Sequence, residues 1–262
     1  MTAKVDIIIV GSGASGAAAA WRLSQNKNLS IACIEQGRKI SPSEYPTTKA
    51  NWEFYKQNTA SFDPNIRASK ADYPIDNSNS AISLANFNGF GGSTLLYSGH
   101  FPRFHPSDFA TKTLDNVGED WPFGYKDLIP YFNQNEYMMG IAGLVGDTAY
   151  PDYDSLLPPV AMGQGAKKLA QAFNSLGWHW WPSYSAINTK KHLNRPSCIN
   201  LGPCNTGCSQ GAKGSVDVTY WPQASLQGVQ VMTECRVFDI SVNKEKKVTG
   251  VGQKSGISCE KL

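Results

Sequence analysis

The sequence predicts an α/β fold built on a parallel sheet, and two observations carry that prediction. Residues 5–10 are an almost continuous run of β-branched residues, which suits a strand buried on both faces. A glycine-rich turn, an alanine-rich segment and a second apolar run at 29–35 follow, so residues 5–35 form one strand–helix–strand unit. Near the other end, an antiparallel meander is predicted from three short apolar runs, at 229–233, 237–242 and 248–251.

Composition excludes several classes of protein. Hydrophobic residues make up 41% of the chain, which excludes a disordered protein. The 24 Lys and Arg residues against 21 Asp and Glu residues give no electrostatic case for nucleic-acid binding. No apolar run reaches the roughly 18 residues that a transmembrane helix needs. The N-terminus lacks the pattern of a secretory signal, so we expect a cytoplasmic protein, with export alongside a partner or peripheral membrane association left open.

Residues 11–16 match the dinucleotide-binding pattern G-x-G-x-x-G. Gly11 allows a tight turn after the strand, Gly13 lets the backbone approach a pyrophosphate, and Gly16 lets the helix pack close to the sheet. Glu35 ends the second strand, where a carboxylate accepts hydrogen bonds from ribose hydroxyls and disfavours a 2′-phosphate. An accidental glycine turn is the alternative, but every part of the motif occurs in order. The sequence therefore predicts a site for FAD or NAD.

A second glycine-rich turn, Gly91-Gly92-Ser93-Thr94, favours FAD. A Gly-Gly pair suits a turn whose backbone approaches a flat ring, although an ordinary glycine turn is the alternative. This turn resembles the flavin-contacting segment of the glucose-methanol-choline (GMC) oxidoreductases, in particular the bacterial branch that includes gluconate and related sugar dehydrogenases. The resemblance covers most of residues 5–251. It continues through Tyr97, Gly99, His100, Pro102, Arg103, Asp120, Trp121, Pro122, Tyr125, Glu136, Cys198, Cys204, Cys208, Lys213 and Tyr220.

The resemblance implies FAD-dependent oxidation of a CH–OH group of an alcohol or sugar, with hydride transfer to flavin N5. It also implies a small-molecule substrate and an electron-acceptor subunit as a partner. No histidine stands at 93–96, near which some members attach flavin covalently, so we expect non-covalent FAD. Many members carry Asn where Tyr97 stands, so the contacts near the reactive edge of the flavin are expected to differ. The cofactor-binding residues it implies are Gly11, Gly13, Ser15, Gly16, Glu35, Gly91, Gly92, Ser93, Thr94 and Val237.

We predict no catalytic residue. The histidine that family members use as general base belongs to a part of the family chain that this sequence does not reach, and the resemblance fades after about Gly252. We therefore expect a C-terminally truncated chain, inactive alone, with a first FAD-binding part at 1–140, a substrate or cap segment at 141–215 and an incomplete return to the FAD-binding domain at 216–262. The alternatives are a non-catalytic FAD-binding fragment and a nicotinamide-dependent dehydrogenase.

Three cysteines, Cys198, Cys204 and Cys208, lie within eleven residues on a glycine-rich segment. Three thiolates on such a loop can converge on one centre. Their spacing resembles that of the cysteines that hold a three-iron cluster in some flavin sugar dehydrogenases of the family, which implies an iron–sulfur site. A Cys198–Cys204 or Cys204–Cys208 disulfide, plain thiols, and zinc bound together with His192 are the alternatives.

The aromatic segment that contains Trp178, Trp180, Trp181 and Tyr184 has two interpretations. It could floor a substrate pocket, or it could be a strand packed on the core, and the alternation of residues 178 and 180 favours the core. His179, among these rings, is expected to be a packing residue rather than a base.

Overall fold

The computed structural model describes residues 4–70 and 72–255. The chain forms two compact units. The first unit contains the residues up to Ser98, Leu201–Gly211 and the residues from Ser215 onward, and the second contains Gly99–Asn200 and Ala212–Gly214. The first boundary therefore falls after residue 98, whereas the sequence analysis placed it after residue 140. The functional names given to the three predicted segments stay predictions, and the end of the third segment lies outside the described residues.

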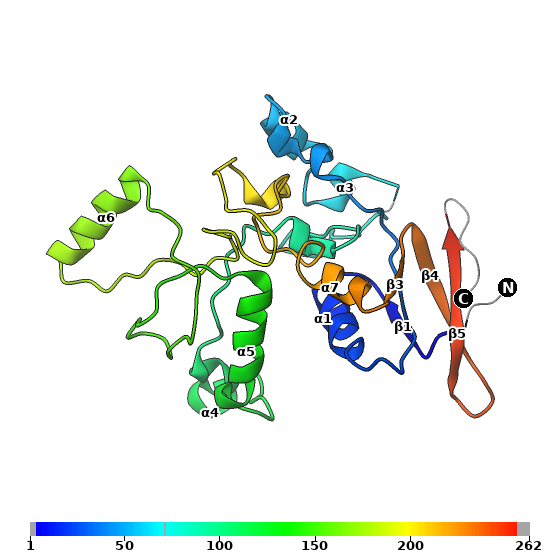
Figure 1. The fold of residues 1–262 in the computed structure, drawn as a ribbon. Coiled ribbons are helices and arrows are strands. Elements are labelled where there is room, and N and C mark those ends of the chain that lie inside the picture. Colours follow the sequence, from blue (N-terminus) through cyan, green and yellow to red (C-terminus); the bar gives the residue numbers. More distant parts are fainter. Residues whose placement is uncertain (1–3, 71, 256–262) are drawn as a thin grey trace. The chain divides into compact units, whose positions relative to one another are not determined.

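A three-stranded parallel sheet is the centre of the first unit (Figure 1). Its strands are β1 (Ile7–Val10), β2 (Ile31–Ile34) and β3 (Gln230–Met232), and β2 lies in the middle. Ile7 pairs with Ile31, and Ala32 pairs with Gln230. All four residues of β2 are buried because the strand has a neighbour on each side. The predicted strand–helix–strand unit is therefore confirmed.

Two helices pack together beside this sheet, α1 (Ala14–Leu23) and α7 (Tyr220–Leu226) (Figure 1). The alanines of α1 permit the close approach, since Ala20 is fully buried. The rings of Trp21 and Tyr220 meet edge to face with centroids 5.7 Å apart. Segments from the two ends of the chain thus share one hydrophobic core.

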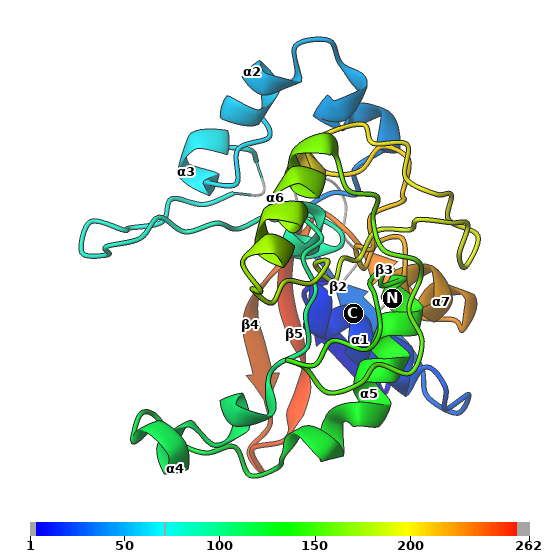
Figure 2. The ribbon, with the colours of Figure 1, turned by 90° about the vertical axis from the view of Figure 1, so that its left-hand side faces the viewer.

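The predicted antiparallel meander is wrong in its first strand. Gln230–Met232 joins the parallel sheet, because the free edge of the buried strand β2 needs a hydrogen-bonding partner. Glu234 then adopts a positive φ of 59°, which turns the chain out of that sheet. The antiparallel part is a ribbon of two strands, β4 (Cys235–Val242) and β5 (Val248–Ser255), which run side by side in both views (Figures 1 and 2).

The stretch at 38–88 is largely irregular where the structure describes it. It contains only short helices, α2 (Trp52–Gln57) and α3 (Pro64–Arg67), and two 3₁₀ turns. The helices of the second unit are α4 (Thr111–Asp115), α5 (Tyr125–Met139) and α6 (Gln164–Ser175). Within the described residues, no helix is both long and apolar enough to cross a membrane.

A buried ion pair organises the second unit. The guanidinium of Arg103 lies 2.5 and 2.7 Å from the two carboxylate oxygens of Glu136 on α5. The same guanidinium lies 4.3 Å from the centre of the Tyr153 ring, and it donates a hydrogen bond to the Tyr125 hydroxyl. Both charged groups are almost fully buried, and these contacts offset the free-energy cost of removing the two charges from water.

The prediction that the tryptophans at 178–181 form a strand in the core is wrong. The segment contains no strand, and Trp178 is 61% exposed. The indole N–H groups of Trp180 and Trp181 donate to the Asn174 side chain and to the Leu144 carbonyl, so loop contacts rather than a sheet fix these rings. Together with their neighbours they line a cleft of about 320 Å³.

The packing of α1 against β1 predicts a large effect of a single methyl group. A Cβ atom at Gly16 would lie 2.1 Å from the carbonyl oxygen of Gly11 and 3.3 Å from the Ile9 side chain. We expect Gly16→Ala to lower the free energy of unfolding by about 3 kcal/mol, as overpacking does in other cores. Urea denaturation of the purified chain measures this change.

The matched control is Gly165→Ala, in the first turn of α6. A Cβ atom there has no neighbour within 4 Å, so the variant should be as stable as the parent or slightly more stable. Equal stability of the Gly16→Ala variant and the parent would contradict the packing described for α1.

Candidate cofactor-binding site

The two glycine-rich turns of the sequence meet in the first unit. A Cβ atom at Gly92 would lie only 2.8 Å from the Cα of Gly13, so the two backbones touch. A cleft of about 460 Å³ opens beside this contact. It is lined by Val10, Gly11, Gly13, Ala14, Ile34, Glu35, Gln36, Asn86, Phe87, Asn88, Gly92, Ser93, Thr94, Cys235, Arg236 and Val237.

The N-terminus of α1 faces this cleft through Gly13 and Ala14. Gly13 is the N-cap residue, and because it has no side chain, no side-chain oxygen of the N-cap occupies the first-turn amides. A Cβ atom at Gly13 would have no neighbour within 4 Å, which means that the space before this backbone is open. Unpaired helix N–H groups with a partial positive charge and open space in front of them suit a phosphate group.

Glu35 is buried and its carboxylate is held by the surrounding backbone. The Oε2 atom accepts hydrogen bonds from the amide and the hydroxyl of Ser12, at 2.8 and 2.7 Å. The Oε1 atom accepts one from the amide of Gly37, at 2.8 Å. Oε2 thus uses both of its acceptor sites, whereas Oε1 keeps one for a further donor. A substitution of Glu35 would therefore disturb the glycine turn.

Ser12 joins four segments of the first unit. Its side chain, fully buried, donates to Glu35 and accepts a hydrogen bond from the amide of Gly91 at 3.0 Å. Its carbonyl accepts a hydrogen bond from the Trp221 indole at 2.7 Å. The first glycine turn is thereby tied to β2, to the second glycine turn and to α7.

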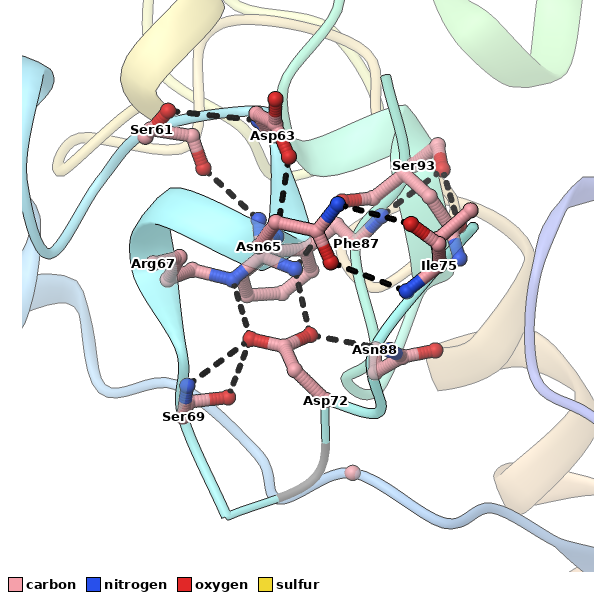
Figure 3. A network of polar contacts seen from close by, with 12 residues as sticks. Ser61, Asp63, Asn65, Arg67, Ser69, Asp72, Ile75, Phe87, Asn88 and Ser93 are labelled. Carbon is pink, nitrogen blue, oxygen red and sulfur yellow. Dashed lines mark hydrogen bonds and ion pairs between the residues drawn. The ribbon is translucent and has the colours of Figure 1, made fainter. Parts of the chain in front are cut away.

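One wall of the cleft comes from the irregular segment 61–93, which a buried ion pair organises (Figure 3). The guanidinium of Arg67 donates to both carboxylate oxygens of Asp72, at 2.9 and 2.6 Å, and both side chains are almost fully buried. Arg67 also donates to the carbonyls of Ser61 and Asn86. Burial by itself raises the pKa of Asp72, but hydrogen bonds from Arg67, Ser69 and Asn88 outweigh it and hold that pKa below its usual range.

The same network positions the residues that line the cleft. Asn88 donates to Asp72 at 2.9 Å and receives a hydrogen bond from Gln36 at 2.5 Å. The Phe87 ring lies 5.0 Å from the guanidinium carbon of Arg67, and the Phe87 amide donates to the Ser93 hydroxyl (Figure 3). The wall is therefore fixed largely by side-chain contacts, because its regular structure is limited to the short helix α3 and a 3₁₀ turn at Gly92–Leu95.

Seven of the ten cofactor-binding residues implied by the sequence line this one cleft: Gly11, Gly13, Glu35, Gly92, Ser93, Thr94 and Val237. Ser15, Gly16 and Gly91 do not line it. Gly16 permits helix packing, and Gly91, with a φ of +100°, shapes the second turn. The roles of all ten toward a cofactor stay predictions.

The sequence analysis missed Arg236, Gln36 and the segment 86–88. Gln36 and Arg236 directly follow or precede predicted residues, Glu35 and Val237, so adjacency in the sequence was an available signal. The segment 86–88 gave none, because its position depends on the Arg67–Asp72 pair.

Comparison with known proteins identifies the family. A profile described as GMC oxidoreductase matches residues 5–260. The chain belongs to the GMC oxidoreductase family. The resemblance stated from the sequence is thus confirmed, and the chain corresponds to the N-terminal part of the family.

Two relatives of this GMC chain show how much of the family it spans. It is 37% identical to 2-methyl-1,2-propanediol dehydrogenase from Mycolicibacterium austroafricanum, over 94% of this chain and 45% of that protein. It is 24% identical to the fructose dehydrogenase large subunit from Gluconobacter japonicus, over 95% of this chain and 48% of that protein. The chain therefore spans less than half the length of these relatives.

A solved structure confirms the fold. Pyridoxine 4-oxidase from Mesorbium loti superposes with a TM-score of 0.60, over 97% of this chain and 47% of that one, at 18% identity. At this identity the match establishes the α/β fold of the GMC chain and no more.

The predicted iron–sulfur site of the GMC chain is not supported. Over residues 4–70 and 72–255, no group of three His, Cys, Asp or Glu side chains could hold a metal ion. Cys198 belongs to the second unit, whereas Cys204 and Cys208 belong to the first. The Cys204–Thr206 segment forms a 3₁₀ turn, and Gly207 then packs tightly on the Tyr45 ring. The described residues thus give no support for a cluster, and the three cysteines form no disulfide with one another.

The histidines all lie in the second unit and each has a hydrogen-bond partner there. His100 bonds Ser183 at 2.7 Å, and His179 bonds the Asp147 carboxylate at 2.9 Å. His105 bonds the carbonyl of Ala149, and His192 bonds that of Tyr137. No catalytic role is assigned to any of them.

The cleft wall depends on the Arg67–Asp72 pair, which predicts the effect of Asp72→Asn. Removing one charge leaves the other buried without its partner, which typically costs about 3–5 kcal/mol. We expect hydrogen exchange to become faster throughout residues 61–93 and slow exchange to persist in β1, β2 and α1. Asp76→Asn is the matched control, because Asp76 is exposed and bonds only Ser78. Equal effects of the two substitutions would contradict the role of the pair.

Lowering the pH should also make hydrogen exchange faster in residues 61–93 of the parent chain. Because the pKa of Asp72 is lowered in the folded chain, its stabilisation is fully present above the unfolded value of about 3.9 and is lost as the pH falls through the folded value. Protection of residues 61–93 should therefore decline below about pH 4, and it should decline less in the Asp72→Asn variant.

Proposed function

We propose that this chain is the FAD-binding part of an oxidoreductase that acts on the CH–OH group of an alcohol or sugar. The observation that carries the proposal is the contact between the Gly13 and Gly92 backbones, with open space before Gly13 and Glu35 on the same cleft. This arrangement offers a site for phosphate, an acceptor for a ribose hydroxyl, and a glycine backbone that a flat ring can approach closely.

The residues present fit non-covalent FAD. The first-turn amides of α1 would bind the pyrophosphate, which needs the missing Cβ at Gly13. The Glu35 carboxylate would accept a hydrogen bond from a ribose hydroxyl through Oε1, and it would repel a 2′-phosphate. The Thr94 hydroxyl donates to the Gly91 carbonyl at 2.7 Å and accepts from the Val216 amide at 3.2 Å, so it would hold the second turn in place against the flavin half.

The reaction class rests on the family. When bound, FAD would accept a hydride from the carbon that bears the substrate's hydroxyl group. The relatives named above are dehydrogenases whose names specify a diol and a sugar, which supports a small hydroxylated substrate. A base for the hydroxyl proton is not among the residues proposed here, and in the family it belongs to the part of the chain that these residues do not cover.

A partner that receives electrons is the second element of the proposal. One relative is named as the large subunit of fructose dehydrogenase, which indicates a multi-subunit enzyme in that case. We extend this to the present chain as an electron-acceptor subunit. The cytoplasmic location stays a prediction from the sequence.

Gly13→Val tests the cofactor site directly. A valine side chain would fill the space before the helix N-terminus, so FAD affinity should fall at least about tenfold, or roughly 1.4 kcal/mol. Gly13 has an ordinary φ of −65° and no neighbour within 4 Å of a Cβ, so the variant should unfold at the same urea concentration as the parent. Equilibrium titration with FAD measures the affinity.

The control compares FAD with NAD. The parent should bind FAD with a shifted flavin absorption band and should bind NAD more weakly. Equal FAD affinity of the parent and of Gly13→Val would place the cofactor elsewhere. Preference for NAD would favour a nicotinamide-dependent dehydrogenase. Alcohol-dependent dye reduction by the chain alone, abolished by changing one of its histidines, would show that it contains its own base.

A further inference from the structure

Arg236 gives the cleft a positive charge that the family pattern of glycines and Glu35 does not include. Among the residues that line the cleft, Arg236 carries the positive charge and Glu35 the negative one. Arg236 is exposed, and in the described part of the chain it takes part in no ion pair. Its guanidinium carbon lies 4.9 Å from the centre of the Tyr73 ring.

The backbone fixes the end of the cleft at which Arg236 lies. The amide of Cys235, the preceding residue, donates to the carbonyl of Glu35 at 2.9 Å. Arg236 therefore follows directly after the point where β4 meets the end of β2. In the proposed function Glu35 binds the ribose of the adenosine, so Arg236 lies on the side where the base attached to that ribose would be. The helix N-terminus at Gly13 serves the phosphates instead.

We propose that the guanidinium of Arg236 stacks on the adenine ring of the bound dinucleotide, with Tyr73 supporting its other face. A guanidinium is planar and weakly hydrated, and it stacks readily on aromatic rings on both faces. The contact with Tyr73 holds the plane in place before the ligand arrives, which reduces the rotamer entropy lost on binding. This inference rests on the proposed function, because it needs FAD in the cleft.

The test is calorimetric titration of the 262-residue chain with FAD and, separately, with ADP, which carries the adenosine and phosphates but no flavin. Arg236→Ala should weaken both ligands by about tenfold, the range measured for stacking on a nucleic-acid base. Arg236→Lys keeps the charge and loses the planar face, so it should weaken both ligands nearly as much.

Two further substitutions test the support. Tyr73→Phe keeps the ring and should bind FAD and ADP like the parent, whereas Tyr73→Leu should weaken both by a smaller factor than Arg236→Ala. Arg22→Ala is the matched control, since Arg22 is an exposed arginine in the last turn of α1, away from the cleft-lining end of that helix. It should leave both affinities unchanged.

The outcomes separate this inference from the proposed function. A parent that binds FAD and ADP, with Arg236→Ala equal to it, overturns the stacking and leaves the proposed function standing. An Arg236→Lys variant equal to the parent also overturns the stacking, because charge alone would then suffice. A parent that binds neither ligand contradicts the proposed function and the stacking together.

Discussion

The buried hydroxyl of Ser12 is the contact on which the cleft depends. It donates to the Glu35 carboxylate and accepts from the Gly91 amide, so one oxygen joins the two glycine turns and the end of β2. Hydrogen bonds to a buried carboxylate are worth more than neutral ones, and a carboxylate or amide left without its partner would lose the full desolvation energy. The short side chain of serine also fits where the two turns converge. The glycines make the turns possible, and the Ser12 hydroxyl holds the two turns against each other.

The sequence predicts the parts of this arrangement that are local. The strand, turn, helix and second strand of residues 5–35 follow from periodicity, and the glycine pattern together with Glu35 indicates one face of the cleft. The parallel position of Gln230–Met232 was not predictable in the same way, because a short apolar run suits either sheet until its partner is known. The prediction that Trp178 packs in the core was wrong for a similar reason. Alternation of residues indicates that they share one face of a strand, but it does not show what covers that face.

The wall at 86–88 shows a further limit. It is positioned by a buried ion pair between Arg67, the last residue of α3, and the loop residue Asp72, and no hydrophobic periodicity predicts such a pair. The cysteine prediction shows the opposite problem, because spacing within a short segment suggested that three thiolates converge, while Cys198 belongs to the second compact unit and Cys204 and Cys208 belong to the first. The two glycine turns meet at one cleft, whereas the three cysteines give no metal site within the described residues. In the first case the motif specifies backbone geometry, whereas in the second it specifies only ligands.

The pairing of β2 with β3 has a consequence for the order of events during synthesis. β2 leaves the ribosome early, but its partner at Gln230–Met232 follows only after the whole second unit has been made. At ordinary elongation rates that interval is on the order of ten seconds or more. Throughout it, a strand whose four residues are all buried in the finished fold has one unpaired edge, a typical starting point for aggregation. The edge of this strand is therefore exposed to other chains during that interval, and the cleft is complete only after residue 237 has been translated.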